Sequence, residues 1–323
     1  MKKKILITGG AGFIGSNLCN YLVNCGYKLV VIDDLSTGNK KNLKKDKNIK
    51  IIIKKIQSNN ISQFFKNIYC CIHLAAKAEI LIDKSKEKKY FNDNVVGLQN
   101  ILNLCALNGI KKFIFASSAS VYGDSKNKKV KESDQINPLH FYGYTKCIGE
   151  KIIKEYCRIN NIKFYILRFF NVFGNKSKAV VAKFLAQDMQ KKNITIYGSG
   201  NQSRDFIHVE DICDVIKNLI IKNISSDIFN VGSSKTITIK ELKNLVSKKN
   251  KAVFLEKRFD DIEKSISNIN KIKLKLNWYP KVNFIHGLNL MKKEDKARLL
   301  KIKIPTIKFQ KKIIKNFNII NSH

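Results

Sequence analysis

The chain has 323 residues, long enough for two lobes, and carries a formal net charge of +36. Such a charge ordinarily suggests nucleic acid or an anionic membrane surface as a partner. Lysines dispersed through nearly every segment account for almost all of it, however, which argues for a compositional bias and against both partners. The eight cysteines have neither CxxC nor metal-ligand spacing, and no run approaches the about 20 apolar residues of a membrane span. We expect a cytoplasmic protein with no bound metal.

An apolar run, three glycines and the start of a helix follow one another within Lys4–Gly15. The run favours a buried parallel strand, and the pattern after it favours a helix over Phe13–Asn24. Gly9, Gly12 and Gly15 would let the backbone turn tightly, approach a pyrophosphate and pack the helix closely on the sheet. Glycines also serve tight turns for steric reasons alone, so the triplet by itself is a weak sign of a nucleotide site.

A second predicted strand, Lys28–Ile32, leads directly into Asp33, about 20 residues after the glycines. At that spacing a dinucleotide site needs an acceptor for the adenosine ribose hydroxyls. An acid there favours NAD, because it would repel the 2′-phosphate of NADP. The glycines and the acid together predict that the chain binds NAD.

Strand and helix patterns continue to alternate, which predicts a Rossmann-type α/β fold: a doubly wound parallel sheet flanked by helices, with a smaller α/β substrate-binding lobe. The small side chain of Ala75 would let a ligand approach the backbone. Asn94 lies inside a predicted helix, where asparagine is disfavoured, so we expect it to bond to something specific. We expect His73 to be structural rather than catalytic. The further elements expected are strands at Ile49–Ile53, Tyr69–His73 and Lys112–Ala116 and a helix at Lys86–Leu107.

Polar side chains, Ser118 among them, gather just after the strand at Lys112–Ala116, at the edge where open α/β sheets bind their ligands. Farther along, Tyr142 and Lys146 stand four residues apart at the start of a predicted helix, so they share one face. A tyrosine that exchanges a proton near neutral pH needs its pKa lowered from about 10 by a positive charge. We therefore expect Lys146 to lower the pKa of Tyr142. An incidental tyrosine–lysine pair is the alternative, against which the serines and the glycine loop argue.

In its motifs and their order the chain resembles the extended short-chain dehydrogenase/reductases. Within them it is similar to the NAD-dependent epimerase/dehydratase family, closest to UDP-glucose and UDP-N-acetylglucosamine 4-epimerases. The resemblance covers about residues 3–290. Each motif is weak alone, but the set in this order is specific. The motifs are TGGAGFIGSNL (8–18), VIDDLSTGN (31–39), HLAA (73–76), NVVG (94–97), SSASVYG (117–123), YGYTK (142–146), LRFFNVFG (167–174), RDFIHVED (204–211), FNVGS (229–233) and NWYPKV (277–282).

The resemblance implies roles for the residues at matching positions. Tyr142 is the expected general base, Lys146 its activator and a ligand of the nicotinamide ribose, and Ser118 the hydroxyl partner of the reacting oxygen. The expected NAD ligands are Gly9, Gly12, Phe13, Ile14, Gly15, Asp33, Ala75, Asn94, Tyr142 and Lys146. The expected substrate ligands are Ser118, Asn171, Arg204, Arg258 and Ser265, of which Asn171 and the two arginines would contact the diphosphate.

The residues after Ser118 discriminate between the reactions of the family. Its 4,6-dehydratases carry an Asp-Glu pair there and its sugar-acid decarboxylases keep the glutamate. This chain has Ala119 and Ser120, which cannot act as a carboxylate acid or base. The resemblance then implies 4-epimerisation of a UDP-hexose: NAD oxidises C4, the keto sugar rotates, and hydride returns to its other face. The alternatives are a nucleotide-sugar oxidoreductase or dehydratase of the same family and, in another class, a basic nucleic-acid-binding protein on this scaffold.

The expected range of substrates rests on one position, Ser265, which follows Arg258 by seven residues. In relatives restricted to plain hexoses this wall of the pocket is often a tyrosine, whereas a small residue accompanies N-acetylated sugars. Serine therefore implies room for UDP-N-acetylhexosamines. The alternative is that Ser265 lies in a loop outside the pocket.

The expected domains follow from the placement of the motifs. Residues 1–170, with a return segment near 199–225, are expected to form the NAD-binding domain, and residues 171–290 mainly the substrate lobe. Residues 291–323 are rich in lysine and match no motif, so we expect a solvated or loosely packed tail, with partial docking as the alternative. The expected assembly is a homodimer.

Overall fold

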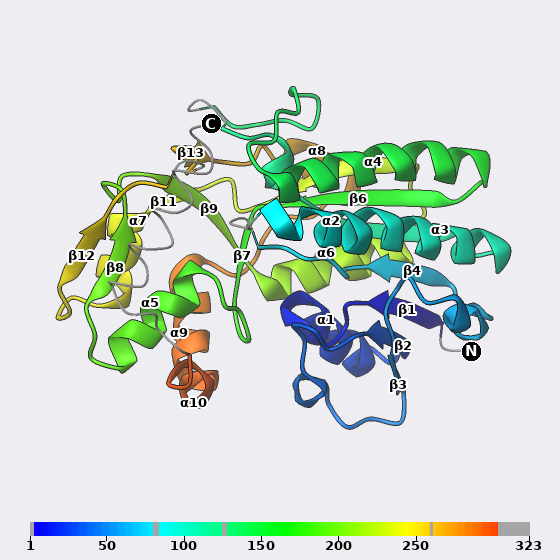
Figure 1. Cartoon of the computed structure of the whole chain (residues 1–323), viewed down its shortest axis with the longest axis horizontal. Coiled ribbons are helices and arrows are strands. Elements are labelled where there is room, and N and C mark those ends of the chain that lie inside the picture. The colour runs from blue at the N-terminus through cyan, green and yellow to red at the C-terminus, as the bar shows by residue number, and fades with distance from the viewer. Residues whose placement is uncertain (1–2, 80–83, 125–127, 259–260, 303–323) are drawn as a thin grey trace.

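The computed structural model describes residues 3–79, 84–124, 128–258 and 261–302. Its largest element is a seven-stranded sheet of order β10-β6-β5-β4-β1-β2-β3, in which all neighbouring strands run parallel (Figure 1). The order reverses between β1 and β4, the place where α/β folds bind ligands. The predicted Rossmann-type fold is confirmed. The strands are β1 (Lys4–Thr8), β2 (Lys28–Asp33), β3 (Ile49–Ile53), β4 (Cys70–His73), β5 (Lys112–Ser118), β6 (Lys163–Phe169) and β10 (Asp227–Val231).

Helices cover both faces of this sheet, because successive residues of each strand point to opposite sides. Ile5 and Ile7 pack in one apolar layer and Leu6 in the other, and all three are fully buried. Strands buried on both faces need continuous apolar runs, as this sequence has. The first layer contains α1 (Phe13–Asn24), α6 (Val209–Ile221) and α8 (Asn270–Leu276), and the second contains η2 (Asn59–Phe65), α3 (Gly97–Leu107) and α4 (Phe141–Ile159).

The helix expected over Lys86–Leu107 is present but contains one wide turn. Between α2 (Glu87–Phe91) and α3, residues Asn92–Val96 form a π-helical segment. Such turns are frequent at functional sites, and this one places the buried Asn94.

A smaller set of strands and helices lies beside the carboxyl ends of the large sheet, on the left of Figure 1. Its central strand, β9, pairs with β7, β11 and β13, while β8 and β12 form a separate parallel pair. Helices pack around Phe173 and Phe206 in its own apolar core. The elements are β7 (Asn171–Phe173), α5 (Val180–Met189), β8 (Ile194–Tyr197), β9 (Ser203–His208), β11 (Thr236–Thr238), α7 (Ile239–Val246), β12 (Ala252–Leu255), β13 (Lys264–Ser265), α9 (Phe284–Glu294) and α10 (Lys296–Leu299).

The lysine-rich C-terminal segment is packed on this smaller core as far as the structure describes it. Met291 and Leu299 are fully buried. The side-chain amide of Gln190 donates to the carbonyl oxygens of Leu300 and Ile302. For residues 291–302 docking is therefore correct and a loosely packed tail is wrong, because apolar residues recur among the lysines. Residues 303–323 lie outside the described residues.

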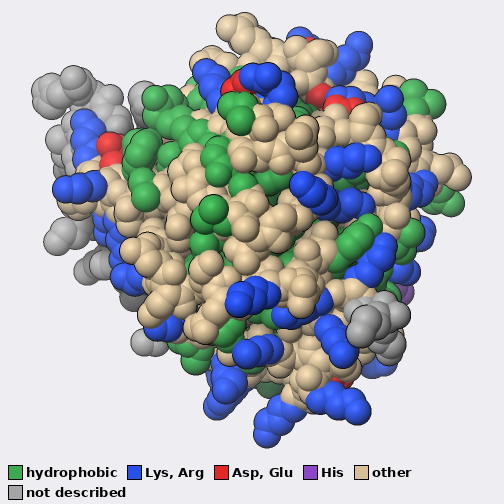
Figure 2. Space-filling model, turned by 90° about the vertical axis from the view of Figure 1, so that its right-hand side faces the viewer, with side chains coloured by type: hydrophobic (Ala, Val, Ile, Leu, Met, Phe, Trp, Pro, Cys, Tyr) green, Lys and Arg blue, Asp and Glu red, His purple; other side chains and the backbone are tan. Residues whose placement is uncertain are grey.

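The face of the molecule shown in Figure 2 carries its positive charge in dispersed form. On the face shown in Figure 2, lysine and arginine side chains are scattered among apolar and neutral polar ones. None of the helices within the described ranges combines the length and apolar character that crossing a membrane would need. In the same part of the chain, no three His, Cys, Asp or Glu side chains gather as a metal site would require.

A buried lysine, Lys112, caps the carboxyl end of a helix. Lys112, at the start of β5, is 6% exposed, and its Nζ donates to the carbonyl oxygens of Leu219, Ile220 and Lys222 at 2.9, 3.0 and 3.1 Å. These are the last carbonyls of α6, which have no partner within the helix, and a cation there also interacts favourably with the helix dipole. Lys112 therefore joins the large sheet to the carboxyl end of α6.

We predict that Lys112→Met lowers the free energy of unfolding by about 3 kcal/mol, because it leaves buried carbonyl groups without a donor. Urea denaturation followed by circular dichroism measures this loss. Lys111→Met is the matched control, since Lys111 is the exposed neighbour, and it should change the same free energy by less than about 0.5 kcal/mol. Equal effects of the two substitutions would contradict the capping role.

Candidate active site

The glycine loop joins β1 to α1 beside the end of β4. Gly9 has φ +70°, and a Cβ there would lie 2.7 Å from the backbone nitrogen of Ala75. A Cβ on Gly15 would lie 2.2 Å from the carbonyl oxygen of Gly9. Any side chain at either position would collide with backbone, so the loop requires glycine for close packing of strand, loop and helix, as its spacing predicted.

The first turn of α1 has donors without an acceptor from its own side chains. Gly12 is the N-cap and makes no side-chain hydrogen bond, and the first turn contains no acidic residue. The N–H groups of Phe13, Ile14 and Gly15 therefore lie at the positive end of the helix dipole, an arrangement that suits an anion such as a pyrophosphate.

Asp33 ends β2 next to this loop. It is 7% exposed, and its two carboxylate oxygens accept hydrogen bonds of 2.8 Å from the backbone N–H groups of Ala11 and Leu35. These bonds fix the carboxylate at the ligand-binding edge of the sheet. Each oxygen keeps a second lone pair, so the group can also accept from a ribose hydroxyl.

Asn94 ties the loop after β4 to the start of α4. Its side-chain oxygen accepts from the backbone nitrogen of Lys77 at 2.8 Å, and its side-chain nitrogen donates to the Lys77 carbonyl and the Thr145 hydroxyl, both at 3.0 Å. The specific bonds expected of an asparagine inside a helix are therefore present, and they are made to the protein.

Ser118, Tyr142 and Lys146 are brought together where β5 ends and α4 begins. The Tyr142 phenol lies near enough to the Ser118 hydroxyl for the two to interact, and the Ser118 hydroxyl donates to that of Ser120 at 3.0 Å. Lys146 is 3% exposed, its Nζ donates to the carbonyl oxygen of Ala116 at 2.7 Å, and it lies 5.8 Å from the centroid of the Tyr142 ring.

The pKa shifts in this group differ from those expected. Burial raises the pKa of Tyr142 to about 12, and the neighbouring Ser118 hydroxyl opposes this rise. Burial also lowers the pKa of Lys146 to about 7, which the nearby Glu150 carboxylate partly offsets. Lys146 is not among the groups that shift the pKa of Tyr142 in this structure. The expectation that Lys146 lowers the pKa of Tyr142 is therefore wrong for the side chains of this chain alone.

Two of the three predicted catalytic residues, Ser118 and Tyr142, and all of the predicted substrate residues line one cavity of about 210 Å³, whereas Lys146 is not among its described lining residues. Ser265, in β13, is part of its wall, so the alternative of a loop outside the pocket is wrong. The lining draws on segments far apart in the sequence, and of the predicted residues it includes Ser118, Tyr142, Asn171, Arg204, Arg258 and Ser265.

Two arginines occupy one end of this cavity. Arg204 forms an ion pair with Asp261 and donates to the carbonyl oxygen of Ser203 at 3.0 Å. The guanidinium of Arg258 lies 3.9 Å from the centroid of the Tyr197 ring, and its Nε has no hydrogen-bond partner among the described residues. Two guanidinium groups next to a cavity suit a diphosphate, whose oxygens can accept bidentate hydrogen bonds.

Comparison with known proteins identifies the family. The model of the NAD dependent epimerase/dehydratase family matches residues 5–232. The chain belongs to this family. It is 32% identical to a putative UDP-glucose 4-epimerase of Methanocaldococcus jannaschii over 311 residues, which cover 91% of this chain and 100% of the relative. Relatives of similar identity include UDP-glucuronic acid decarboxylases.

Solved structures of the family agree with the fold throughout. The UDP-N-acetylglucosamine 4-epimerase of Methanobrevibacter ruminantium, in complex with UDP-N-acetylmuramic acid, has a TM-score of 0.87 at 30% identity, with 92% of this chain and 100% of that chain covered. The UDP-glucuronic acid 4-epimerase of Bacillus cereus, in complex with UDP-glucuronic acid and NAD, has a TM-score of 0.85 at 30% identity, with 91% and 99% covered.

The cofactor of this epimerase/dehydratase family member is NAD. The residues of this chain fit NAD on two counts. The first turn of α1 offers N–H donors that no side chain caps, and Asp33 presents a fixed carboxylate at the end of β2. The glycine loop brings these features next to each other.

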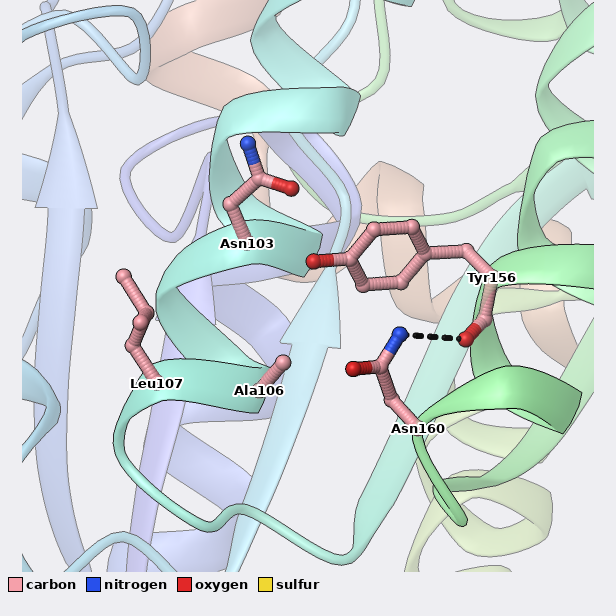
Figure 3. A pocket seen from close by; sticks show the side chains of 5 residues that line it. All are labelled: Asn103, Ala106, Leu107, Tyr156 and Asn160. Atoms are coloured by element: carbon pink, nitrogen blue, oxygen red, sulfur yellow. Dashed lines mark hydrogen bonds between the residues drawn. The ribbon is translucent and has the colours of Figure 1, made fainter.

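A second, more open cavity, of about 350 Å³, lies between the carboxyl-terminal halves of α3 and α4. Tyr156 of α4 points toward α3, and the Asn160 amide donates to the Tyr156 carbonyl at 2.9 Å (Figure 3). None of the predicted site residues lines this cavity, so its size does not make it the active site of the family. Its lining residues are Asn103, Ala106, Leu107, Tyr156 and Asn160.

Several residues of the site were missed in the sequence. His140, Asp261 and Ile262 line the cavity without having been predicted to. Asp261 could have been found from its place three residues after Arg258. His140 precedes α4 and accepts from the backbone nitrogen of Gly143 at 3.1 Å, the N-cap position that a helix-start pattern points to.

His73 is structural, as expected. Its Nδ1 bonds to the Thr8 hydroxyl at 2.9 Å, and its ring stacks between Phe113 and Phe115. Burial, reinforced by the positive charge of Lys146, lowers the pKa of His73 to about 3. The ring is therefore neutral in the folded protein at pH values where the unfolded chain would protonate it.

We predict that His73 contributes an acid-dependent loss of stability. Between about pH 6.5, its ordinary pKa, and pH 3, the unfolded state binds one proton more than the folded state, so stability falls as the pH falls. Within this window the free energy of unfolding of the wild type should fall by about 1.4 kcal/mol per pH unit more steeply than that of His73→Gln. Denaturation at pH 6, 5 and 4 measures both slopes. Parallel slopes would mean that the folded protein also protonates His73.

Proposed function

We propose that this chain is an NAD-dependent 4-epimerase of UDP-hexoses that also accepts UDP-N-acetylhexosamines. The lining of the cavity carries the proposal: Tyr142 and Ser118 share it, and the one carboxylate among its described lining residues, Asp261, is paired with Arg204. Ala119 and Ser120 stand where the dehydratases of the family have carboxylates. Such a site suits proton and hydride exchange at C4, because elimination or decarboxylation would need a further acid or base beside the sugar.

Tyr142 removes the proton of the C4 hydroxyl in this proposal, and Ser118 hydrogen-bonds to the same oxygen. NAD, when bound, supplies the hydride acceptor and donor for C4 and a positive charge near the base. A nearby positive charge favours the phenolate and so offsets the burial that raises the pKa of Tyr142. Lys146 adds its own charge when protonated and holds the nicotinamide ribose. Tyr142 returns the proton when the sugar is reduced again.

The remaining roles divide between the two ends of the site. Asn171, Arg204 and Arg258 bind the diphosphate of the substrate, and Ser265 forms the wall beside the sugar. Residues 1–170, with the return segment, form the NAD-binding domain, residues 171–290 form mainly the substrate lobe, and the protein is a cytoplasmic homodimer. The proposed NAD ligands are Gly9, Gly12, Phe13, Ile14, Gly15, Asp33, Ala75, Asn94, Tyr142 and Lys146.

A panel of substrates tests the reaction. Purified protein is incubated with UDP-glucose, UDP-galactose, UDP-N-acetylglucosamine and UDP-glucuronic acid without added reductant, and the C4 epimers are separated by chromatography. Interconversion of UDP-glucose and UDP-galactose supports the proposal. Release of NADH in proportion to added sugar would instead indicate an oxidoreductase. Loss of CO₂ from UDP-glucuronic acid would indicate the activity of the decarboxylase relatives.

We predict that Tyr142→Phe lowers kcat by about 10²- to 10⁴-fold, because it removes the proton acceptor. NAD should remain bound, because the glycine loop and Asp33 are unchanged; the cofactor released on heat denaturation measures its content. Tyr144→Phe is the matched control, since Tyr144 lies two residues away on α4 and is 52% exposed. It should keep wild-type activity. A Tyr142→Phe variant with near-normal kcat would disprove the assigned role.

We predict that Ser265→Tyr selectively removes activity on UDP-N-acetylglucosamine, because the larger side chain fills the space that an acetyl group at C2 needs while the sugar rotates. Activity on UDP-glucose should stay within about tenfold of the wild type. Ser265→Ala, which keeps the space open, should retain both activities. A wild type that epimerises UDP-glucose but not UDP-N-acetylglucosamine would contradict this account of the wall.

A further inference from the structure

A glutamine behind the two arginines contacts the supports of both. Gln202 precedes β9, is 7% exposed, and is not among the described residues that line the cavity. Its side-chain nitrogen donates to the carbonyl oxygen of Tyr197 at 2.6 Å and to a carboxylate oxygen of Asp261 at 3.0 Å. A primary amide has two N–H groups, so these two bonds use its whole donor capacity.

Each of the two residues that accept from Gln202, Tyr197 and Asp261, also contacts one of the arginines. The ring of Tyr197 lies under the guanidinium of Arg258, 3.9 Å from ring centroid to guanidinium carbon. The second oxygen of the Asp261 carboxylate forms the ion pair with Arg204. Gln202 therefore connects β8, which ends at Tyr197, with the segment after β12 that contributes Arg258 and Asp261. Removing its amide would take one hydrogen bond from the backbone under one guanidinium and one from the counter-ion of the other.

The charges of Arg204 and Arg258 explain why these two side chains need fixed supports. Burial lowers the pKa of Arg204, and Asp261 opposes that shift. The Arg258 guanidinium has an aromatic face beneath it and an Nε without a hydrogen-bond partner among the described residues. Two partly buried guanidinium groups beside one cavity keep a defined geometry only if fixed neighbours hold them, as Tyr197 and Asp261 do here.

We propose that Gln202 is a positioning residue that aligns Arg204 and Arg258 for the diphosphate of the nucleotide-sugar substrate, an inference that rests on the proposed function. Gln202 acts through the arginines and does not touch the substrate. Its effect therefore falls on binding of the nucleotide and not on the proton and hydride exchange at Tyr142.

The test measures UDP binding by titration calorimetry together with the kinetics of epimerisation. Gln202→Leu keeps the approximate size of the side chain and removes both donors. We expect its Kd for UDP and its KM for UDP-glucose to rise about 10- to 100-fold, the effect of losing hydrogen bonds to charged groups, with kcat within about twofold of the wild type. Gln187→Leu is the matched control, because Gln187 is 4% exposed in the same core and its amide bonds to Thr195. It should lose stability without any change in KM.

Gln202→Glu provides a second variant that a merely structural role would not explain. At pH 8 its carboxylate can donate to neither acceptor and repels Asp261, so UDP binding should be at least as weak as in Gln202→Leu. At pH 5 a protonated glutamic acid regains one donor. The Kd of Gln202→Glu for UDP should therefore improve about tenfold relative to the wild type between pH 8 and pH 5. This comparison remains valid if Gln202→Leu fails to fold.

The two hypotheses fail in different ways. A wild type that does not bind UDP would overturn the proposed function. A wild type that binds UDP, with unchanged Kd and KM in both Gln202 variants, would overturn the positioning role alone. A fall in kcat at unchanged KM would also overturn it, because the defect would then lie in the chemical step.

Discussion

The substrate side of the cavity depends on one buried carboxylate that fastens the small sheet to the large one. Asp205, in β9, is fully buried, and it accepts hydrogen bonds from the backbone and hydroxyl groups of Ser233 and Ser267 and from the backbone of Ser234. Ser233 and Ser234 follow β10 of the large sheet, and Ser267 follows β13. Because a buried carboxylate is costly without such donors, the arrangement fixes three segments against one another. Arg204 and Ser265 flank these contacts in the chain and are placed by them.

This joint also explains why motifs far apart in the sequence occur together. Asp205 belongs to RDFIHVED and its partner Ser233 to FNVGS, so one motif supplies the acceptor and the other the donors. Asp211, in the first of these motifs, accepts from the backbone nitrogens of Lys281 and Val282 in NWYPKV at 2.8 and 3.2 Å. Hydrogen bonds thus join the first of these motifs to each of the other two. A single sequence reveals the parts, but their pairing appears only once the chain has folded.

The sequence predicts best where structure is decided locally. The glycine loop, the helix over Phe13–Asn24 and the strand ending at Asp33 lie in the structure where glycine spacing and apolar runs put them, and this pattern is enough to predict the Rossmann-type fold. The wide turn around Asn94 and the burial of Lys112 could not be predicted, because each depends on carbonyl or hydroxyl groups from distant segments. The same holds for Gln202, whose two acceptors come from β8 and from beyond β12. Residue type and position predicted most of the side chains that share the cavity. They did not predict the residues, such as Gln202, whose hydrogen bonds hold those side chains in place.

The electrostatics of α4 show why a side-chain pattern alone cannot establish a catalytic role. Lys146 and Glu150 stand one turn apart, and both are buried. Glu150 is fully compensated: Arg168 donates to both of its oxygens and Ser117 donates to one of them. The Nζ of Lys146 bonds to a carbonyl and, within the described part of the chain, to no carboxylate, and burial lowers its pKa to about 7. A compensated pair keeps its charge and holds the core together. A cation with no carboxylate hydrogen-bonded to it, among the described residues, has a charge that can respond to what binds in the cavity beside Tyr142. That difference follows from the surroundings of each group and is invisible in the i, i+4 spacing that first drew attention to Tyr142 and Lys146.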